Sequence, residues 1–166
     1  MMSLSHFFEV YLPLLGFILT MMTLLWPLSL VLRNASIVDP FWGLGFIITA
    51  IWGIFKFGPP SNWAGWLMLV LLVIWGTRLS VYLLIRNWGK GEDPRYQAFR
   101  AHYGADRYGY VSLFQVFWLQ GLILWLVFLP LTVLWLNPVD VNEIFMILGF
   151  ILGLIACISC CYKNDS

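Results

Sequence analysis

The feature that most constrains this chain is a series of long apolar stretches separated by short polar ones. An α-helix needs about 20 apolar residues to cross the hydrocarbon core of a bilayer. The chain is 61% hydrophobic and only 10% charged, whereas soluble domains carry about 25% charged residues. We therefore predict an all-α integral membrane protein with a single transmembrane domain over residues 1–166. The five predicted helices cover residues 8–32, 41–57, 63–85, 112–136 and 143–162.

Lysine and arginine residues gather on one side of this predicted domain. Successive helices cross in opposite directions, so the connections after the first and third helices and the segment after the fifth share a side. These segments hold most of the basic residues: Arg33, Arg86, Lys90, Arg95, Arg100, Arg107 and Lys163. Lys56 is left for the other side. Because basic residues near helix ends stay in the cytoplasm, we predict an external amino terminus and a cytoplasmic carboxyl terminus.

Residues 86–111 form the one long polar connection, a predicted cytoplasmic loop. Asp93 followed by Pro94 is typical of a helix start, and Gly104 is typical of a helix end. One face of this short helix collects aromatic side chains: Tyr96, Phe99 and Tyr103. Two interpretations stay open. The helix either only anchors the loop among membrane lipid headgroups, or forms a basic, aromatic rim that binds a phosphate-bearing cofactor or lipid.

Two ionisable residues lie within or beside the predicted membrane helices. Arg78 lies about two turns inside the third helix, on the same face as Tyr82 and Arg86. A charge at that depth either snorkels to the interface or marks a functional site. Asp39 directly precedes Pro40, which is typical of a helix N-cap. Alternatively, Asp39 pairs with Arg78 or Arg86, because all three are predicted near the cytoplasmic side.

Small residues at four-residue spacing indicate helices that pack closely in lipid. One such stripe consists of Gly45, Thr49 and Gly53, and a second consists of Gly149, Gly153 and Cys157. These stripes predict close contacts with neighbouring helices or with a second copy of the chain.

Charge and cysteine usage exclude several other classes. The formal net charge is only +1, which gives no indication of a nucleic-acid partner. The three cysteines cluster near the carboxyl terminus, far in sequence from both histidines. An odd, clustered set of cysteines is not a disulfide framework, and without a fourth ligand nearby it does not predict a zinc site.

Four segments resemble the motifs of a family of multi-spanning membrane proteins, mostly bacterial, that was long known only as a domain of unknown function. The segments are SIVDPFWGLG (residues 36–45), WGTRL (75–79), GKGEDPRY (89–96) and SLFQVFWLQG (112–121). The resemblance covers about residues 30–150. That family is grouped with the steroid 5-alpha-reductases and, more distantly, with sterol reductases and isoprenylcysteine methyltransferases. The likeness implies a location in a bacterial inner membrane.

The resemblance also implies NADPH-dependent reduction of a carbon–carbon double bond in a lipid-like or steroid-like substrate. In such a reaction the cofactor supplies the hydride, while the protein positions the substrate and polarises a conjugated carbonyl group. Asp39 and Tyr82 are the candidate catalytic residues, because a carboxylic acid or a tyrosine can donate the polarising hydrogen bond. Arg78, Arg86 and Arg95 are the candidate residues for binding the cofactor.

The chain departs from that family in its carboxyl-terminal part. Full-length relatives continue further and carry an Arg-His-Pro-Asn-Tyr type segment that binds the nicotinamide cofactor, whereas no His-Pro pair occurs here. After Phe150 the sequence does not resemble the family's continuation. We therefore expect the amino-terminal portion of a reductase-like protein, truncated or frame-shifted. It would be inactive, and would not bind NADPH, without a complementing carboxyl-terminal half.

Two other classes compete with this expectation. One is a small non-enzymatic membrane protein, such as an assembly partner of another subunit. It is favoured by the short chain and the glycine stripes, and it predicts copurification with a stoichiometric partner. The other is a transporter or channel, which would rest on the intramembrane Arg78 alone, without a broken helix pair or an inverted repeat.

Overall fold

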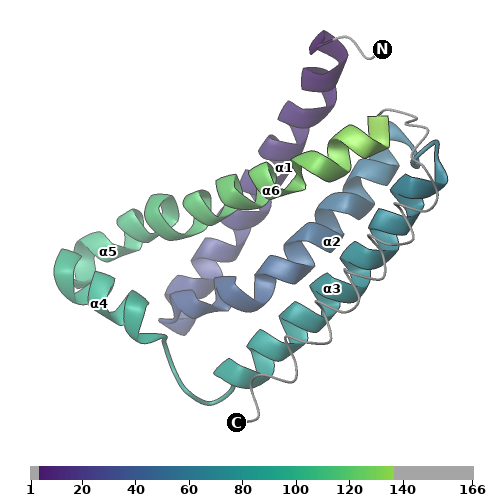
Figure 1. The fold of residues 1–166 in the computed structure, drawn as a ribbon. Coiled ribbons are helices and arrows are strands. Elements are labelled where there is room, and N and C mark those ends of the chain that lie inside the picture. The colour runs from purple at the N-terminus through teal and green to yellow at the C-terminus, as the bar shows by residue number, and fades with distance from the viewer. Residues whose placement is uncertain (1–3, 137–166) are drawn as a thin grey trace.

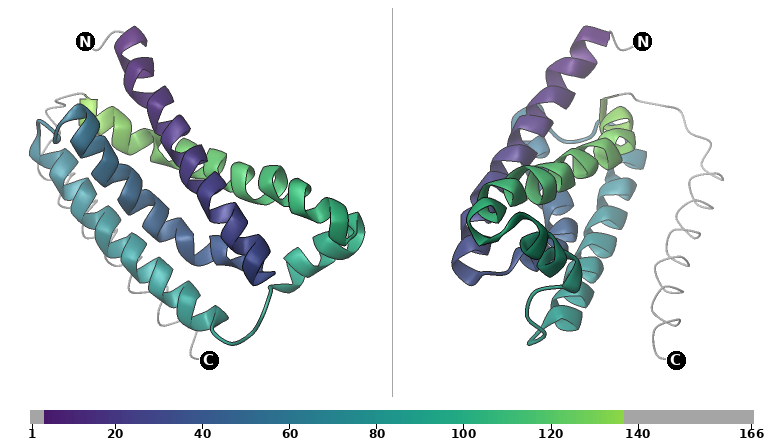
Figure 2. Two further views of the ribbon diagram at one scale, coloured as in Figure 1. Left: turned by 180° about the vertical axis from the view of Figure 1, so that it is seen from behind. Right: turned by 90° about the vertical axis from the view of Figure 1, so that its left-hand side faces the viewer.

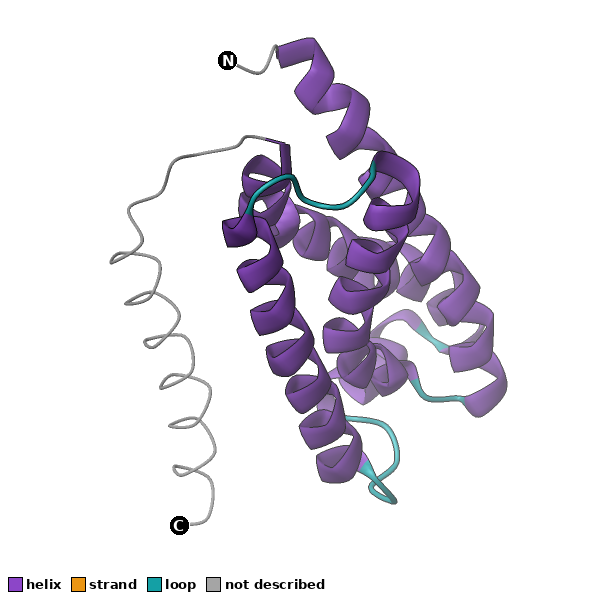
Figure 3. Cartoon of the chain, turned by 90° about the vertical axis from the view of Figure 1, so that its right-hand side faces the viewer, coloured by secondary structure: helices purple, strands orange, loops and turns teal. Residues whose placement is uncertain are grey.

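The computed structural model describes residues 4–136, which form helices joined by short loops and contain no strand (Figures 1 and 3). Four segments of this described part are long and apolar enough to cross a membrane: Ser5–Leu32, Ala35–Phe57, Trp63–Asn87 and Arg107–Val133. For these residues the structure therefore confirms the predicted all-helical chain, with several helices long and apolar enough to span a membrane. The predicted fifth helix, residues 143–162, and the second small-residue stripe lie outside the described residues.

The first three long helices follow the predicted boundaries closely. They are α1 (Leu4–Leu32), α2 (Val38–Phe57) and α3 (Trp63–Asn87). A 3₁₀ turn, η1 (Ala35–Ile37), leads directly into α2, so α2 begins before residue 41, where we predicted its start. Asp39 consequently lies inside the first turn of α2, and the N-cap position belongs to Ile37. The prediction that Asp39 caps this helix is wrong.

The predicted polar loop is largely helical. Its first helix, α4 (Pro94–Tyr103), is the predicted one: the Asp93 carboxylate accepts the Arg95 N–H at 2.9 Å, and Gly104 ends the helix with φ +76°. Three further elements then follow without a break: α5 (Ala105–Ser112), the π-helix η2 (Leu113–Trp118) and α6 (Leu119–Leu136). The fourth long helix therefore starts earlier than the predicted Ser112.

The long helices pack as two crossing pairs around one apolar core (Figures 1 and 2). α2 and α3 lie side by side and antiparallel, while α1 crosses η2 and α6. The core side chains between them are almost fully buried: Ile18, Met22, Phe46, Phe117, Leu124 and Phe128.

Glycines set the distance between these helices. A Cβ atom added to Gly43 would overlap the carbonyl oxygen of Gly76, so the backbones of α2 and α3 touch at this point. The Ser80 hydroxyl reinforces the contact, because its oxygen accepts the backbone N–H of Leu44 at 2.9 Å. The predicted stripe on α2 is also confirmed as a packing surface, and its partner is α6: a Cβ on Gly45 would lie 2.8 Å from the Leu124 side chain.

One end of the bundle collects the polar connections. The segment that links α1 to α2 and the segment that links α3 to α4 lie together at this end, opposite the turn between α2 and α3 (Figure 1). As a result, α4 lies against the beginning of α2, and the polar groups of both segments meet there.

Candidate functional site

Hydrogen bonds join the η1 turn to the segment before α4. The Asp93 N–H donates to the Ser36 hydroxyl oxygen at 2.7 Å, and the Ala35 N–H donates to Glu92 Oε1 at 2.9 Å. Arg100 pairs with the same Glu92 carboxylate through Nε at 3.0 Å and Nη2 at 2.9 Å. These bonds fix the amino-terminal end of α4 against the start of α2.

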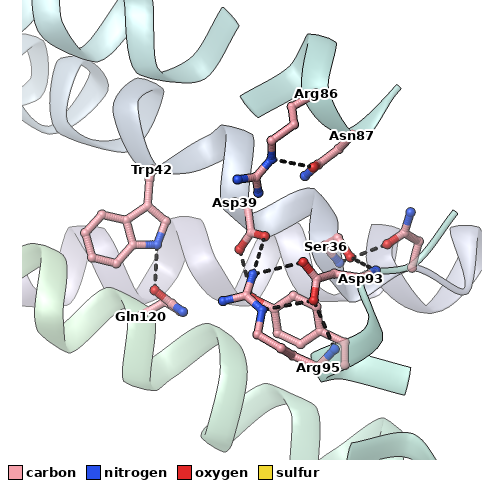
Figure 4. A network of polar contacts seen from close by, with 10 residues as sticks. Ser36, Asp39, Trp42, Arg86, Asn87, Asp93, Arg95 and Gln120 are labelled. Atoms are coloured by element: carbon pink, nitrogen blue, oxygen red, sulfur yellow. Dashed lines mark hydrogen bonds and ion pairs between the residues drawn. The ribbon is translucent and has the colours of Figure 1, made fainter. Parts of the chain in front are cut away.

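Asp39 is the central side chain of this end. It is only 9% exposed and accepts two hydrogen bonds from α4: from the Tyr96 hydroxyl to Oδ1 at 2.8 Å, and from Arg95 Nη2 to Oδ2 at 3.3 Å. Arg95 also pairs with Asp93 through Nε at 2.9 Å and Nη2 at 3.1 Å (Figure 4). The ion pair of Asp39 in the structure is with Arg95, which the sequence did not single out as its partner. Arg86 also lies close enough to Asp39 to stabilise its charge.

The charges of this cluster reinforce one another. The hydrogen bonds from Arg95 hold the pKa of Asp93 below its usual range, and those to Asp93 raise the pKa of Arg95. The pKa of Tyr96 is raised by burial and by the nearby Asp39 carboxylate. Tyr96 therefore stays protonated near neutral pH and remains a hydrogen-bond donor to Asp39.

A cavity of about 330 Å³ opens beside Asp39. Four elements contribute its lining: Asp39 and Trp42 from α2, Leu79, Leu83 and Arg86 from α3, Arg95 from α4, and Gln120 from α6. The Trp42 indole N–H donates to the Gln120 side-chain oxygen, which fixes both groups at the cavity wall (Figure 4). We call this space the polar cavity.

A second cavity of about 310 Å³ lies between the same three long helices. Its lining is apolar: Phe46, Met68, Leu71, Leu72, Ile74, Trp75, Val127, Phe128, Pro130 and Leu131. On α2, Phe46 lies one turn beyond Trp42, and on α3, Trp75 lies one turn before Leu79. The two cavities therefore follow each other along the same helices. They are separate spaces with no common lining residue among the described residues, and we call the pair the groove.

The structure brings three of the five predicted site residues together. Asp39, Arg86 and Arg95 line the polar cavity. Among the described residues, the lining of neither cavity includes Arg78 or Tyr82, and the Tyr82 side chain is 40% exposed.

Sequence reasoning also missed contributors to the site. The sequence places Tyr96 on an aromatic face that either anchors among lipid headgroups or forms a rim for a phosphate-bearing ligand, whereas in the structure Tyr96 is buried against Asp39. Sequence analysis did not identify Trp42 and Gln120 as site residues. Both lie in segments that carry the family resemblance, and their position there is the signal that could have identified them.

Asp93 gives this site a defined dependence on pH. A carboxylate with a lowered pKa in the folded state stabilises the fold at higher pH, and this contribution is lost as pH falls through the folded pKa. We therefore expect a nearly constant melting temperature from neutral pH down to about pH 5, and a decrease below about pH 4. Thermal unfolding of the detergent-solubilised protein across this range measures the effect. Asp93→Asn should remove most of the decrease in melting temperature at acid pH. If this variant shows the same decrease, other carboxylates cause it.

Comparison with known proteins gives a family but no characterised relative. The sequence profile of a family described as "Protein of unknown function (DUF1295)" matches residues 25–163. The match continues past Phe150, so the prediction that the family likeness ends there is wrong. No curated protein and no protein of solved structure matches the chain. Because the profile covers most of the sequence, the chain belongs to this family of proteins of unknown function, DUF1295.

Proposed function

We propose that this membrane protein binds an amphiphilic lipid in the groove, with the headgroup in the polar cavity and the hydrocarbon tail in the apolar cavity. The observation that carries the proposal is the order of the two cavities along α2, α3 and α6. A hydrocarbon chain gains free energy by contact with the apolar lining, while a headgroup needs the polar partners that the other end supplies. The lipid is the substrate or ligand of the site.

The proposed orientation places the headgroup at the cytoplasmic side. The polar end of the bundle carries Arg33, Arg86, Lys90, Arg95, Arg100 and Arg107, while Lys56 lies at the end of α2 that meets the opposite turn. Under the positive-inside rule, the polar cavity then opens near the cytoplasmic headgroup layer, and the amino terminus lies outside. In a bacterium this membrane is the inner membrane.

Blocking the apolar cavity tests the proposal. Val127 lines this cavity and is 54% exposed, whereas Val70 on α3 is similarly exposed at 50% but does not line it. We expect Val127→Trp to lower the affinity for lipid about tenfold, which corresponds to about 1.4 kcal/mol, because the indole would take up space in the cavity that the tail occupies. Val70→Trp should leave the affinity unchanged. Native mass spectrometry of the purified protein with titrated dioleoyl lipids measures occupancy, and equal retention by both variants would contradict the proposed site.

Reduction of a lipid double bond is the second candidate function. Its specific support is that Asp39, a candidate catalytic residue, lines the polar cavity and is hydrogen-bonded to the Tyr96 hydroxyl. Because Asp39 accepts hydrogen bonds from both Tyr96 and Arg95, it would act there as a carboxylate that orients neighbouring donors and not as the polarising acid. The apolar cavity suits a hydrocarbon tail better than the ribose and amide groups of NADPH, because its lining is almost entirely apolar. We therefore assign the groove to the lipid substrate. Fluorescence titration of NADPH against the lipid-loaded protein tests this candidate, and saturable binding would support it.

A further inference from the structure

The charged groups of the polar cavity indicate which headgroup it accepts. Its lining contains two arginines, Arg86 and Arg95, and one carboxylate, Asp39. Asp93 pairs with Arg95 beside the cavity, so the two arginines and the two carboxylates are formally balanced. A headgroup would therefore be recognised by hydrogen bonds from the guanidinium groups and not by an excess of positive charge.

Both arginines of the polar cavity lie near Asp39. Arg95 comes from α4 and is held by Asp93, while its side chain remains 65% exposed. Arg86 comes from α3 and donates from Nε to Asn87 Oδ1 at 3.2 Å. Figure 4 shows the terminal nitrogens of Arg86 turned toward Asp39, the same side chain to which Arg95 donates. Planar guanidinium groups bind phosphate oxygens in pairs, so this arrangement suits a phosphate group.

We infer that the polar cavity binds the phosphodiester of an anionic membrane lipid between Arg86 and Arg95. The inference rests on the proposed lipid-binding function and names the headgroup class. Asp39 limits the charge that the cavity accepts, because a phosphomonoester carries about −1.5 to −2 charges at neutral pH and would be repelled by the carboxylate. The apolar cavity beyond Trp42 favours a lipid phosphate over a free phosphate ion, because a free ion has no tail to bury there.

Competition between matched lipids tests the inference. The purified full chain in a neutral detergent is titrated with dioleoylphosphatidylglycerol, with dioleoylglycerol, which has the same tails and no phosphate, and with inorganic phosphate. We expect phosphatidylglycerol to bind at least about tenfold more tightly than dioleoylglycerol, because charge-assisted hydrogen bonds to phosphate are strong. Inorganic phosphate should not displace it at comparable concentrations.

Arginine variants assign the preference to this cavity. Arg86→Gln should reduce the tenfold difference between the two lipids to about twofold or less, and its thermal unfolding verifies that the variant is folded. Arg107→Gln is the matched control, because Arg107 is an exposed arginine of α5 outside the cavity lining of the described residues. This control should keep the full difference.

The outcomes separate this inference from the proposed function. Equal affinities for the two lipids, or an equal loss in both arginine variants, would overturn the headgroup assignment while leaving a lipid-binding groove. Displacement of the lipid by inorganic phosphate at similar concentrations would show a free-phosphate site and also overturn the inference. Saturable binding of neither lipid would instead overturn the proposed function itself.

Discussion

Gly43→Ala is expected to lower the free energy of unfolding by about 3 kcal/mol. The added methyl group would overlap the Gly76 carbonyl oxygen and lie 2.5 Å from the Ser80 hydroxyl oxygen. A backbone carbonyl cannot turn aside as a flexible side chain can, so α2 and α3 must separate along their whole contact. The same separation would break the hydrogen bond from Leu44 to Ser80. Thermal unfolding in detergent, followed by circular dichroism, measures the loss.

Gly16→Ala is the matched control for this change. Gly16 also lies inside a long helix, α1, but no atom lies within 4 Å of the position that its Cβ would take. Alanine has the higher helix propensity, so this variant should be neutral or more stable by up to about 1 kcal/mol. A Gly43→Ala protein as stable as Gly16→Ala would mean that α2 and α3 do not touch at Gly76.

Glu92→Ala is expected to destabilise the protein by about 3 kcal/mol. The Glu92 carboxylate is 9% exposed and accepts hydrogen bonds from the Ala35 N–H and from Arg100. Its removal leaves a buried backbone donor and a half-buried guanidinium group without their acceptor. Because these bonds hold α4 against the start of α2, lipid affinity should fall together with stability. Chemical unfolding and the lipid titration, performed on the same preparation, test both effects.

A double-mutant cycle separates the interaction between Glu92 and Arg100 from other effects of the single substitutions on the loop. If Glu92 and Arg100 stabilise the fold through each other, the combined change to alanine should cost less than the sum of the two single changes, by about 1–3 kcal/mol. Glu9→Ala provides the control for loss of an exposed carboxylate, because the Glu9 side chain is 74% exposed and should change stability by less than about 0.5 kcal/mol. Additive single changes would contradict the coupling.

Local features of this protein were predictable from its sequence. Apolar length gave the long helices to within a few residues, and the Asp93–Pro94 pair with Gly104 gave both ends of α4. Each of these signals depends on neighbouring residues, because caps and helical periodicity act within one or two turns. The stripe of Gly45, Thr49 and Gly53 likewise predicted close packing, although it did not identify α6 as the partner.

The candidate site was predictable only in part, because its contacts join distant segments. Asp39 meets Arg95 and Tyr96 across more than 50 residues of sequence, and no local pattern specifies that pairing. The spacing predicted Arg78, Tyr82 and Arg86 on one face of α3, but of these three only Arg86 lines the polar cavity, together with Leu79 and Leu83. The Gly43–Gly76 contact helps to determine which side of α3 faces the cavity, because it fixes how α3 lies on α2.

The π-helix η2 determines the angular phase of the helix that follows it. Its hydrogen bonds span five residues where an α-helix spans four, so it holds extra chain in nearly the same axial length. If one residue of η2 were lost and the segment wound as ordinary α-helix, every later side chain would turn by about 100° around the axis. Gln120 would then leave Trp42, and Leu124 and Phe128 would leave the core together. The length of this segment is therefore as strict a requirement as the identity of any residue in it.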